Sequence, residues 1–465
     1  PASMAIQPRP GAARGIHTAT LAGRKPRRAV DSGIAQIAAG FGLVILVGFI
    51  LLSLPISSTE REWVEPRVSL FTTVSAVCVT GLIVVDTPAH WSVFGELVVL
   101  GLIQIGGLGY MVGTTVVLWA LGRRLGIRDR NMLRQYYGAP SMGETLSFAR
   151  AVGIFTLVFE STGMAVLTLA RYFHGDSWGE AAWWGFFHAI SAFNNAGFAL
   201  TEIDMAQSSG SPAIVLPMVV LIVAGSLGFL PVMAIVKWKS FSRLALDHKL
   251  VLTTAAFLLV FGTLFITALE WNNQETVGEH PPIERPLAGL FHTANRTSGF
   301  SAFDVGQMSD ESKLVTIGLM FVGGAAGSTA GGLKLGAFSL LFALMLSPLR
   351  GQQPVSAFNR RIPRAVVQQA TTLALFFVAL VFGFAVLLTL TTDQPFIDVL
   401  FEAVSATCTV GFSAAGTLTF GSTGHLILIA GMLIGRFAPL MLVLYMTKPR
   451  RRVSYSHADD SVRLG

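Results

Sequence analysis

The chain has 465 residues, of which 52% are hydrophobic and 13% are charged. A soluble protein carries about 25% charged residues, so this composition excludes a soluble globular fold. Several apolar runs exceed the roughly 20 residues that cross a bilayer, which indicates a membrane protein with several spans. The net charge is +7, but no basic patch is interleaved with aromatic residues, so nucleic acid is not expected as a partner.

The chain begins with a basic segment, residues 1–32, which we interpret as a cytoplasmic tail. A mitochondrial-type targeting signal is the alternative interpretation of this segment. We expect the natural start at Met4, with residues 1–3 preceding it.

The rest of the chain is predicted to hold four successive units. They cover residues 33–135, 136–248, 249–362 and 363–448, and a cytoplasmic tail follows at 449–465. Each unit has an apolar span, an apolar helix too short to cross, a turn and a second span. The predicted spans are 33–54 and 94–121, 148–169 and 214–236, 250–269 and an interrupted one at 314–346, and 365–390 and 425–445.

A glycine turn after each short helix relates the four units. Gly81, Gly197 and Gly411 each follow a Ser-Ala pair by six and five residues, and Gly299 follows Thr293-Ala294 at the same offsets. The four glycines are 116, 102 and 112 residues apart. Self-similarity at a regular period indicates one structural unit used repeatedly, here the size of a helix, a re-entrant loop and a second helix.

The charged residues predict the orientation of the spans. Lysine and arginine cluster after every second span and at both ends of the chain. The positive-inside rule assigns these segments to the cytoplasm, and the acidic links before the short helices to the outside. We therefore expect eight crossings, four loops that enter from the outer face, and both termini in the cytoplasm.

The four turns predict a cation site. Non-helical backbone at membrane depth is tolerated where it is buried in protein or lines a water-filled cavity. The C-terminal end of each short helix carries partial negative charge toward its turn, and backbone carbonyls can replace the hydration shell of an ion. The alternative is that these glycines only allow close helix packing, but four copies at one spacing favour a pore.

At these residues the chain resembles the Trk/Ktr/HKT potassium transporter superfamily, specifically its Ktr-type membrane subunit. The resemblance runs from about residue 33 to the end and is carried by four motifs; the chain has no room for the extra helix pair of Trk-type members. It implies an all-α integral membrane fold of four M1–pore loop–M2 repeats around one pore with pseudo-fourfold symmetry. The motifs are Val79–Asp86, Phe193–Phe198, Arg296–Phe300 and Thr407–Phe412.

The resemblance also implies which residues form the selectivity filter. In plant relatives a serine at the first filter glycine accompanies sodium selectivity, and this chain has Gly81 there, which implies potassium. The third copy has a shorter Phe-to-Gly spacing, so its contacts are the least certain. The implied filter, with K⁺ at its carbonyls, comprises Cys78, Val79, Thr80, Gly81, Asn194, Asn195, Ala196, Gly197, Arg296, Thr297, Ser298, Gly299, Cys408, Thr409, Val410 and Gly411.

Two further features predict a gate. The stretch Gly323–Gly332, rich in glycine, serine and threonine, lies within the second span of the third unit. We expect it to interrupt the helix, because each glycine destabilises a helix by roughly 1 kcal/mol. In the family the matching segment is an intramembrane loop that obstructs ion flow; the alternative is a tightly packed kink. The implied gate residues are Gly323, Gly324, Gly327, Ser328, Thr329, Gly331, Gly332, Lys334 and Arg436.

Two arginines near the pore have alternative interpretations. A charge at the depth of Arg436 marks a functional candidate, and the family has an arginine there that faces the pore as an electrostatic barrier. The alternative is that Arg436 pairs with a buried carboxylate such as Glu160. For Arg296 we favour a structural role, in which it binds neighbouring loop carbonyls, over direct contact with the ion.

The resemblance implies a homodimer in the cell (inner) membrane, seated on a cytosolic ring of nucleotide-binding regulatory subunits. ATP, ADP or NAD is expected only on that ring, because no Walker or GxGxxG motif lies in a βαβ context here. No covalent cofactor is expected, and potassium is the transported ion, with sodium dependence left open. Cys78 and Cys408 are interpreted as small buried hydrophobes. A coupled secondary transporter and a membrane-embedded enzyme are the other classes, disfavoured by the single repeat orientation and the lack of paired catalytic residues.

Overall fold

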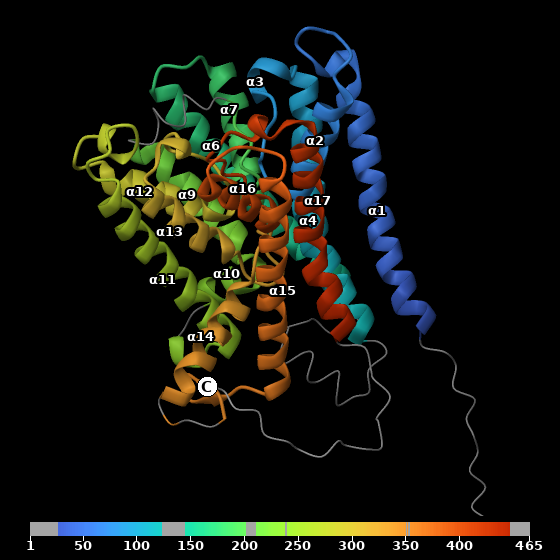
Figure 1. Ribbon diagram of the computed structural model, residues 1–465, viewed down its shortest axis with the longest axis vertical. Helices are drawn as coiled ribbons and strands as arrows, with labels where there is room; N and C mark the ends of the chain where they lie inside the picture. Colours follow the sequence, from blue (N-terminus) through green and yellow to red (C-terminus); the bar gives the residue numbers. More distant parts are fainter. Residues whose placement is uncertain are drawn as a thin grey trace, which may run out of the picture.

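The computed structural model describes residues 27–122, 145–200, 211–237, 240–349, 351 and 354–446. This part of the chain is mostly helical (Figure 1), and its one sheet is a two-residue hairpin of β1 (Ser356–Ala357) and β2 (Arg360–Arg361). The two predicted tails, the basic loop after the second span and the link after the second turn lie wholly or largely outside the described residues.

In the first two units, long helices flank a short one. The first unit has α1 (Arg27–Ser53), α2 (Pro66–Cys78), α3 (Thr87–His90) and α4 (Val93–Gly122); the second has α6 (Thr145–Phe173), α7 (Trp178–Asn194), α9 (Pro212–Leu227) and α10 (Phe229–Val236).

The last two units repeat the pattern. The third unit has α11 (Leu246–Leu269), α12 (Arg285–Ala294), α13 (Asp310–Phe321) and α14 (Leu335–Leu349); the fourth has α15 (Arg364–Thr389), α16 (Phe396–Cys408) and α17 (Gly421–Met446). One-turn 3₁₀ segments complete the described chain: η1 (Pro55–Ser57), η2 (Phe241–Arg243), η3 (Val277–Glu279), η4 (Asn295–Thr297), η5 (Val305–Gln307) and η6 (Thr417–Phe420).

Local sequence explains where the short helices begin. Pro66 starts α2, where its missing N–H and fixed φ suit the first helical turn. Ser177 caps α7 in a reciprocal pair with Glu180, which satisfies two N–H groups that the helix itself leaves unpaired. The C-terminal ends of these two helices are set separately, by the left-handed residues Val79 and Asn195.

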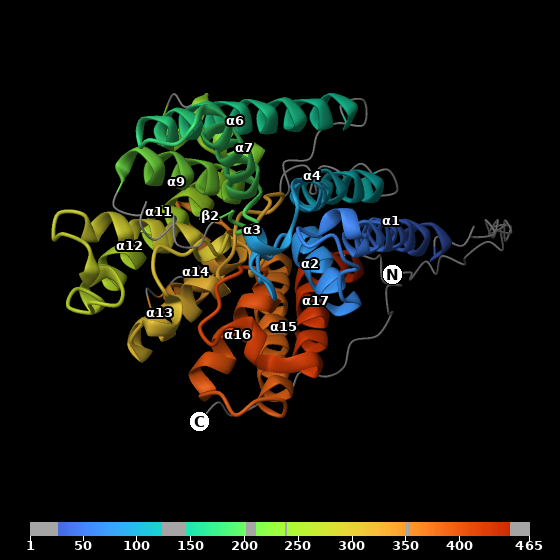
Figure 2. The ribbon, with the colours of Figure 1, turned by 90° about the horizontal axis from the view of Figure 1, so that it is seen from above.

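The short helices α2, α7, α12 and α16 pack in a closed cycle. Each contacts the first long helix of its own unit and one helix of the preceding unit: α4 contacts α7, α9 contacts α12, α13 contacts α16, and α17 contacts α2. Viewed from above, the four short helices lie on different sides of a common centre (Figure 2). The last helix, α17, thus packs against the short helix of the first unit.

Four described helices are long and apolar enough to cross a membrane: Ala149–Phe173, Leu246–Leu269, Arg364–Thr389 and Thr417–Leu442. The pair α9 and α10 counts as a fifth span if its two parts are taken together. The number of eight crossings therefore stays a prediction.

The span expected at 214–236 is broken into α9 and α10, and the sequence did not predict this bend. The axes of α9 and α10 differ by 113° at Gly228, whose φ is 72°. The carbonyls of Gly225 and Ser226, which a continuous helix would pair with residues 229 and 230, accept instead from the N–H groups of Thr329 and Ala325 at 3.2 and 2.8 Å. The helix ends because another segment takes its hydrogen bonds.

Glu270, directly after the end of α11, holds the link that follows this helix through several hydrogen bonds. Its carboxyl accepts hydrogen bonds from the hydroxyls of Thr276 and Ser309 at 2.6 and 2.8 Å and from the Ser309 N–H at 3.0 Å. Burial alone would raise the pKa of Glu270, but the hydrogen bonds of Ser312, Thr276 and Ser309 outweigh it and lower the pKa below its ordinary value of 4.5.

We predict that acidification destabilises the protein partly through Glu270. A carboxyl with a lowered folded-state pKa contributes stability that is complete above its unfolded pKa of about 4.3 and is lost as pH falls through the folded value. The unfolding temperature of the detergent-solubilised wild type should therefore fall on acidification below that value, and Glu270→Gln should weaken this dependence. Gln at the exposed Glu275 serves as the control; an equal effect there would contradict the assignment.

Candidate ion site formed by four turns

Three of the four turns have the same backbone. After α2, α7 and α16 the chain enters the left-handed region at Val79, Asn195 and Thr409, with φ of 56°, 59° and 52°. In each, the next residue donates its N–H to a carbonyl five residues back, as Thr80 does to Ser75 at 2.8 Å. This is the Schellman ending, in which glycine usually takes the left-handed position. A β-branched residue there is strained, and such strain persists where the surroundings hold it.

A serine hydroxyl supports each of these three turns. The Ser75 hydroxyl accepts from the Gly81 N–H at 3.1 Å and donates to the Leu82 carbonyl at 2.8 Å. Ser405 accepts from Gly411 at 3.1 Å, and Ser191 donates to Phe198 at 2.8 Å. The serine six residues before the glycine therefore braces the turn, which explains its recurrence in the sequence.

The third turn is built differently. Helix α12 runs into η4, and the Gly299 N–H donates to the Asn295 carbonyl at 2.8 Å. No non-glycine residue of this turn is left-handed. The contacts of this copy were the least certain from its shorter Phe-to-Gly spacing, and the structure shows that its helix ends in a 3₁₀ turn.

The four glycines meet in a ring of backbone contacts. Gly81, Gly197, Gly299 and Gly411 have φ of 91°, 73°, 78° and 108°. A Cβ on each would overlap the backbone of the next turn: Ala196 oxygen for Gly81, Ser298 oxygen for Gly197, Val410 oxygen for Gly299 and Thr80 oxygen for Gly411. Each position requires glycine because its φ is positive and because a side chain would overlap the neighbouring turn. The contact of Gly411 with Thr80 closes the ring from the fourth unit to the first.

The side chains before the glycines point into different surroundings. Cys78 and Cys408, the chain's two cysteines, are both free and buried, as predicted for small hydrophobes. Asn195 donates to the Thr329 hydroxyl at 3.0 Å and accepts from the Thr297 hydroxyl at 2.8 Å. One asparagine thus joins the second turn, the third turn and the Gly323–Gly332 loop.

The Gly323–Gly332 loop separates α13 from α14 and packs against two of the turns. It is pinned at its base by the parallel bridge between Val322 and Leu333. A Cβ on Gly331 would lie 2.5 Å from the Cys408 carbonyl oxygen, and the Thr329 hydroxyl donates to the Phe193 carbonyl at 3.3 Å. The loop therefore touches the second and fourth turns directly.

Three basic residues contact backbone carbonyls around this loop. Arg436 donates to the Thr329 carbonyl at 2.7 Å, and Lys334 to the Ala330 carbonyl at 2.6 Å. The Arg296 guanidinium contacts the carbonyls of Leu319, Val322 and Gly323.

The sequence left open an ion pair between Glu160 and Arg436. In the structure, the partners of Glu160 are two side-chain amides. Its carboxyl accepts from Gln104 and Asn194, both at 3.1 Å. The sequence also did not reveal the part of Glu402, which accepts from Ser413 and Thr417 at 2.8 and 2.7 Å, just beyond the fourth glycine. A carboxyl within an apolar short helix was the available signal for this contact.

The family TrkH, described as cation transport protein, matches residues 41–453. This chain belongs to that family. It is 34% identical over 414 residues to the Ktr system potassium uptake protein B of Bacillus subtilis, covering 89% of this chain and 92% of the relative.

Two other relatives extend the comparison. The Ktr system potassium uptake protein B of Vibrio alginolyticus is 32% identical, covering 91% of this chain and 92% of its own. The potassium/sodium uptake protein NtpJ of Enterococcus hirae is 31% identical, covering 93% and 97%. These relatives are uptake proteins and not enzymes.

The fold is similar to the crystal structure of the potassium transporter TrkH from Vibrio parahaemolyticus. The match has a TM-score of 0.64 at 18% identity and covers 92% of this chain and 87% of that one. The helical membrane fold is thus shared.

We predict that Gly411→Ala destabilises the protein more than Gly175→Ala. The two glycines have nearly the same φ, 108° and 113°, so the backbone strain of about 1 kcal/mol is common to both. A Cβ at Gly175 meets nothing within 4 Å, whereas one at Gly411 overlaps Thr80, which adds roughly 1–3 kcal/mol. Thermal unfolding in detergent measures the difference; equal losses would show that the ring contact adds nothing.

Proposed function

We propose that this protein is the pore-forming membrane subunit of a potassium uptake system. The observation that carries the proposal is the closed ring of four glycine turns, each at the C-terminal end of a short helix. Helix ends with partial negative charge favour a cation, and carbonyls of the turns replace its water. Potassium then moves down its electrochemical gradient.

The filter in this proposal consists of the residues before and at the four glycines. Potassium binds the carbonyls of the turns, while the serines behind them and the ring contacts keep the backbone from collapsing on a smaller ion. The relatives named as potassium uptake proteins support the choice of ion.

The architecture in this proposal is four M1–pore loop–M2 repeats with eight crossings and pseudo-fourfold symmetry. The repeats are residues 33–135, 136–248, 249–362 and 363–448, with cytoplasmic tails at 1–32 and 449–465. The cyclic packing of α2, α7, α12 and α16 supports it. The positive-inside rule supports a plasma membrane orientation with both termini in the cytoplasm.

The gate in this proposal is the Gly323–Gly332 loop together with Arg436. The loop contacts the second and fourth turns, and Arg436 donates to its Thr329 carbonyl. A fixed positive charge below the turns opposes a cation, so the loop and the charge form one barrier. Opening is a population shift between loop positions, driven by contacts that differ between them.

The assembly in this proposal is a homodimer on a cytosolic ring of regulatory subunits that bind ATP, ADP or NAD. The two Ktr relatives are each named protein B of a Ktr system, which supports an assembly with further proteins. The basic cytoplasmic segments supply the docking surface.

The alternative is a sodium-coupled or less selective monovalent cation transporter. The Enterococcus hirae relative is named a potassium/sodium uptake protein, which supports this option. Uptake of ⁸⁶Rb⁺ into proteoliposomes, with and without sodium, decides between the two: rubidium uptake that is independent of sodium favours potassium conduction, and an absolute sodium requirement favours coupling. No rubidium uptake under either condition would contradict both.

We predict that Gly81→Ser lowers the K⁺/Na⁺ permeability ratio. A side chain at Gly81 overlaps the Ala196 carbonyl oxygen and displaces one ligand of the filter. The matched control is Gly416→Ser, since Gly416 also has positive φ, 75°, but no neighbour closer than Thr419 at 4.0 Å. Unchanged permeability ratios in Gly81→Ser proteoliposomes would count against the filter assignment.

We predict that deleting residues 323–332 raises the flux. The deletion joins Val322 to Leu333, which already lie next to each other in the parallel bridge, so the ends to be joined are close. Initial rates of ⁸⁶Rb⁺ uptake measure the effect, with thermal unfolding as the check on folding. A folded deletion variant with unaltered uptake would show that the loop is only a kink.

A further inference from the structure

A buried carboxyl lies in the middle of α6 and has no basic partner. Glu160 is 8% exposed, and no ion pair to it occurs in the described part of the chain. Its helix is one of the four that are long and apolar enough to span a membrane. An ionisable group there is costly and marks a functional position, so its contacts require an explanation.

Glu160 belongs to a triangle of three side chains from three helices. The Gln104 amide of α4 donates to Glu160 Oε2 at 3.1 Å, and the Asn194 amide of α7 donates to Glu160 Oε1 at 3.1 Å. Asn194 also donates to Gln104 Oε1 at 2.8 Å. The triangle joins the first unit, the first helix of the second unit, and the last residue before the second turn.

The neighbouring backbone of α4 is shaped to admit Asn194. A Cβ added at Gly107 would overlap Asn194 Oδ1, which is buried and has no hydrogen-bond partner in the described residues. The amide of Asn194 is therefore fixed on one side by hydrogen bonds and on the other by the helix surface.

Asn194 is two residues from a carbonyl of the ring. It precedes the left-handed Asn195, and the next residue is Ala196, whose carbonyl lies against Gly81. A shift of the Asn194 side chain is transmitted along this short, strained stretch. The carbonyl position next to Gly81 thus depends on the triangle.

We propose that Glu160 is a positioning residue for ion selectivity, which holds the second turn in place through Asn194 and Gln104. The proposal rests on the filter function proposed above. The carboxylate is suited to this role because it accepts from two amides at once, and charge-assisted hydrogen bonds are stronger than neutral ones.

The test is a set of substitutions in which the carboxyl is removed and then returned on the other helix. In Glu160→Gln an amide replaces the carboxyl, so two N–H₂ groups compete for one acceptor. In the double variant Glu160→Gln with Gln104→Glu, the carboxylate moves to α4 and all three hydrogen bonds of the triangle are satisfied again. We expect Glu160→Gln to lower the K⁺/Na⁺ permeability ratio about two- to tenfold, the effect of one lost hydrogen bond, and the double variant to restore it.

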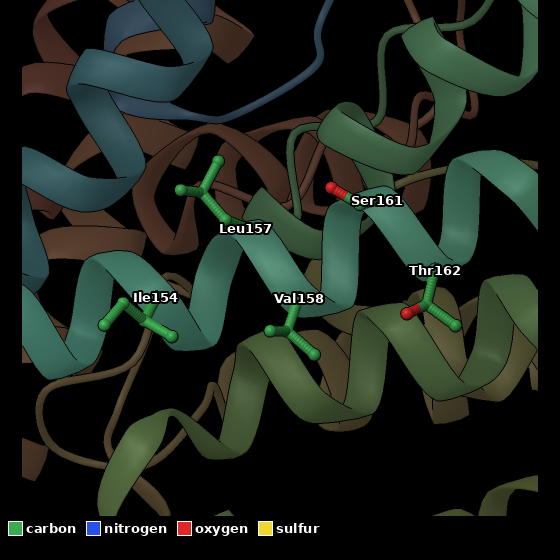
Figure 3. Close-up of a pocket in the computed structure, with 5 residues that line it drawn as sticks. All are labelled: Ile154, Leu157, Val158, Ser161 and Thr162. Atoms are coloured by element: carbon green, nitrogen blue, oxygen red, sulfur yellow. The ribbon is translucent and has the colours of Figure 1, made fainter.

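The matched control is Thr162→Ala on the same helix. Thr162 lies with Ile154, Leu157, Val158 and Ser161 in a shallow pocket on the exposed side of α6 (Figure 3), and we expect its ratio to equal that of wild type. A second comparison leaves charge untouched: Gly107→Ala pushes on Asn194, whereas Gly101→Ala on the same helix meets nothing within 4 Å. Only Gly107→Ala should lower the ratio.

The outcomes separate this inference from the proposed function. If wild-type proteoliposomes discriminate K⁺ from Na⁺ but Glu160→Gln does so equally well, the positioning role is wrong and the filter stands. If Glu160→Gln lowers only the unfolding temperature, or if the double variant fails to restore the ratio, the group is merely structural. If wild type itself shows no discrimination, the proposed function fails first.

Discussion

Backbone hydrogen bonding inside the membrane is the constraint on which the rest of the structure depends. Water is absent there, so every turn must find its partners within the protein. The turns after α2, α7 and α16 do so through left-handed residues and braced glycines, and the turn after α12 does so through a 3₁₀ segment. Each turn also contacts the next one. The conformation that pairs the backbone groups of each turn is therefore the same one that closes the ring. In the function proposed above, this arrangement supplies a cation site of carbonyls without any charged ligand.

Much of the fold could be predicted because its signals are local. The short helices are too short to cross a membrane, a serine or threonine lies six residues before each turn glycine, and glycines interrupt the span at 323–332. Each of these signals lies within a short stretch of sequence. The shorter Phe-to-Gly spacing of the third copy left its contacts uncertain, and its 3₁₀ ending was not predicted. The need for glycine at the four ring positions could also be predicted. The turn itself requires a residue with positive φ and no side chain toward the axis.

The remaining features arise from contacts between units, which no local pattern reveals. The break at Gly228 results from hydrogen bonds that come from residues 325 and 329, about a hundred positions later. The triangle of Gln104, Glu160 and Asn194 combines residues from two units with no common spacing. For that reason the sequence offered Arg436 only as an alternative partner of Glu160, whereas the partners are two neutral amides.

At the bend between α9 and α10, the end of α9 and the Gly323–Gly332 loop share the same hydrogen bonds. The Gly225 and Ser226 carbonyls that a straight helix would use internally are engaged by the Gly323–Gly332 loop. Withdrawal of the loop would strand both acceptors in a dry interior unless α9 rewound past residue 228 or water entered. Motion of the one element is therefore inseparable from a change in the other, and a spectroscopic pair of labels across Gly228 would register loop displacement without any probe on the loop.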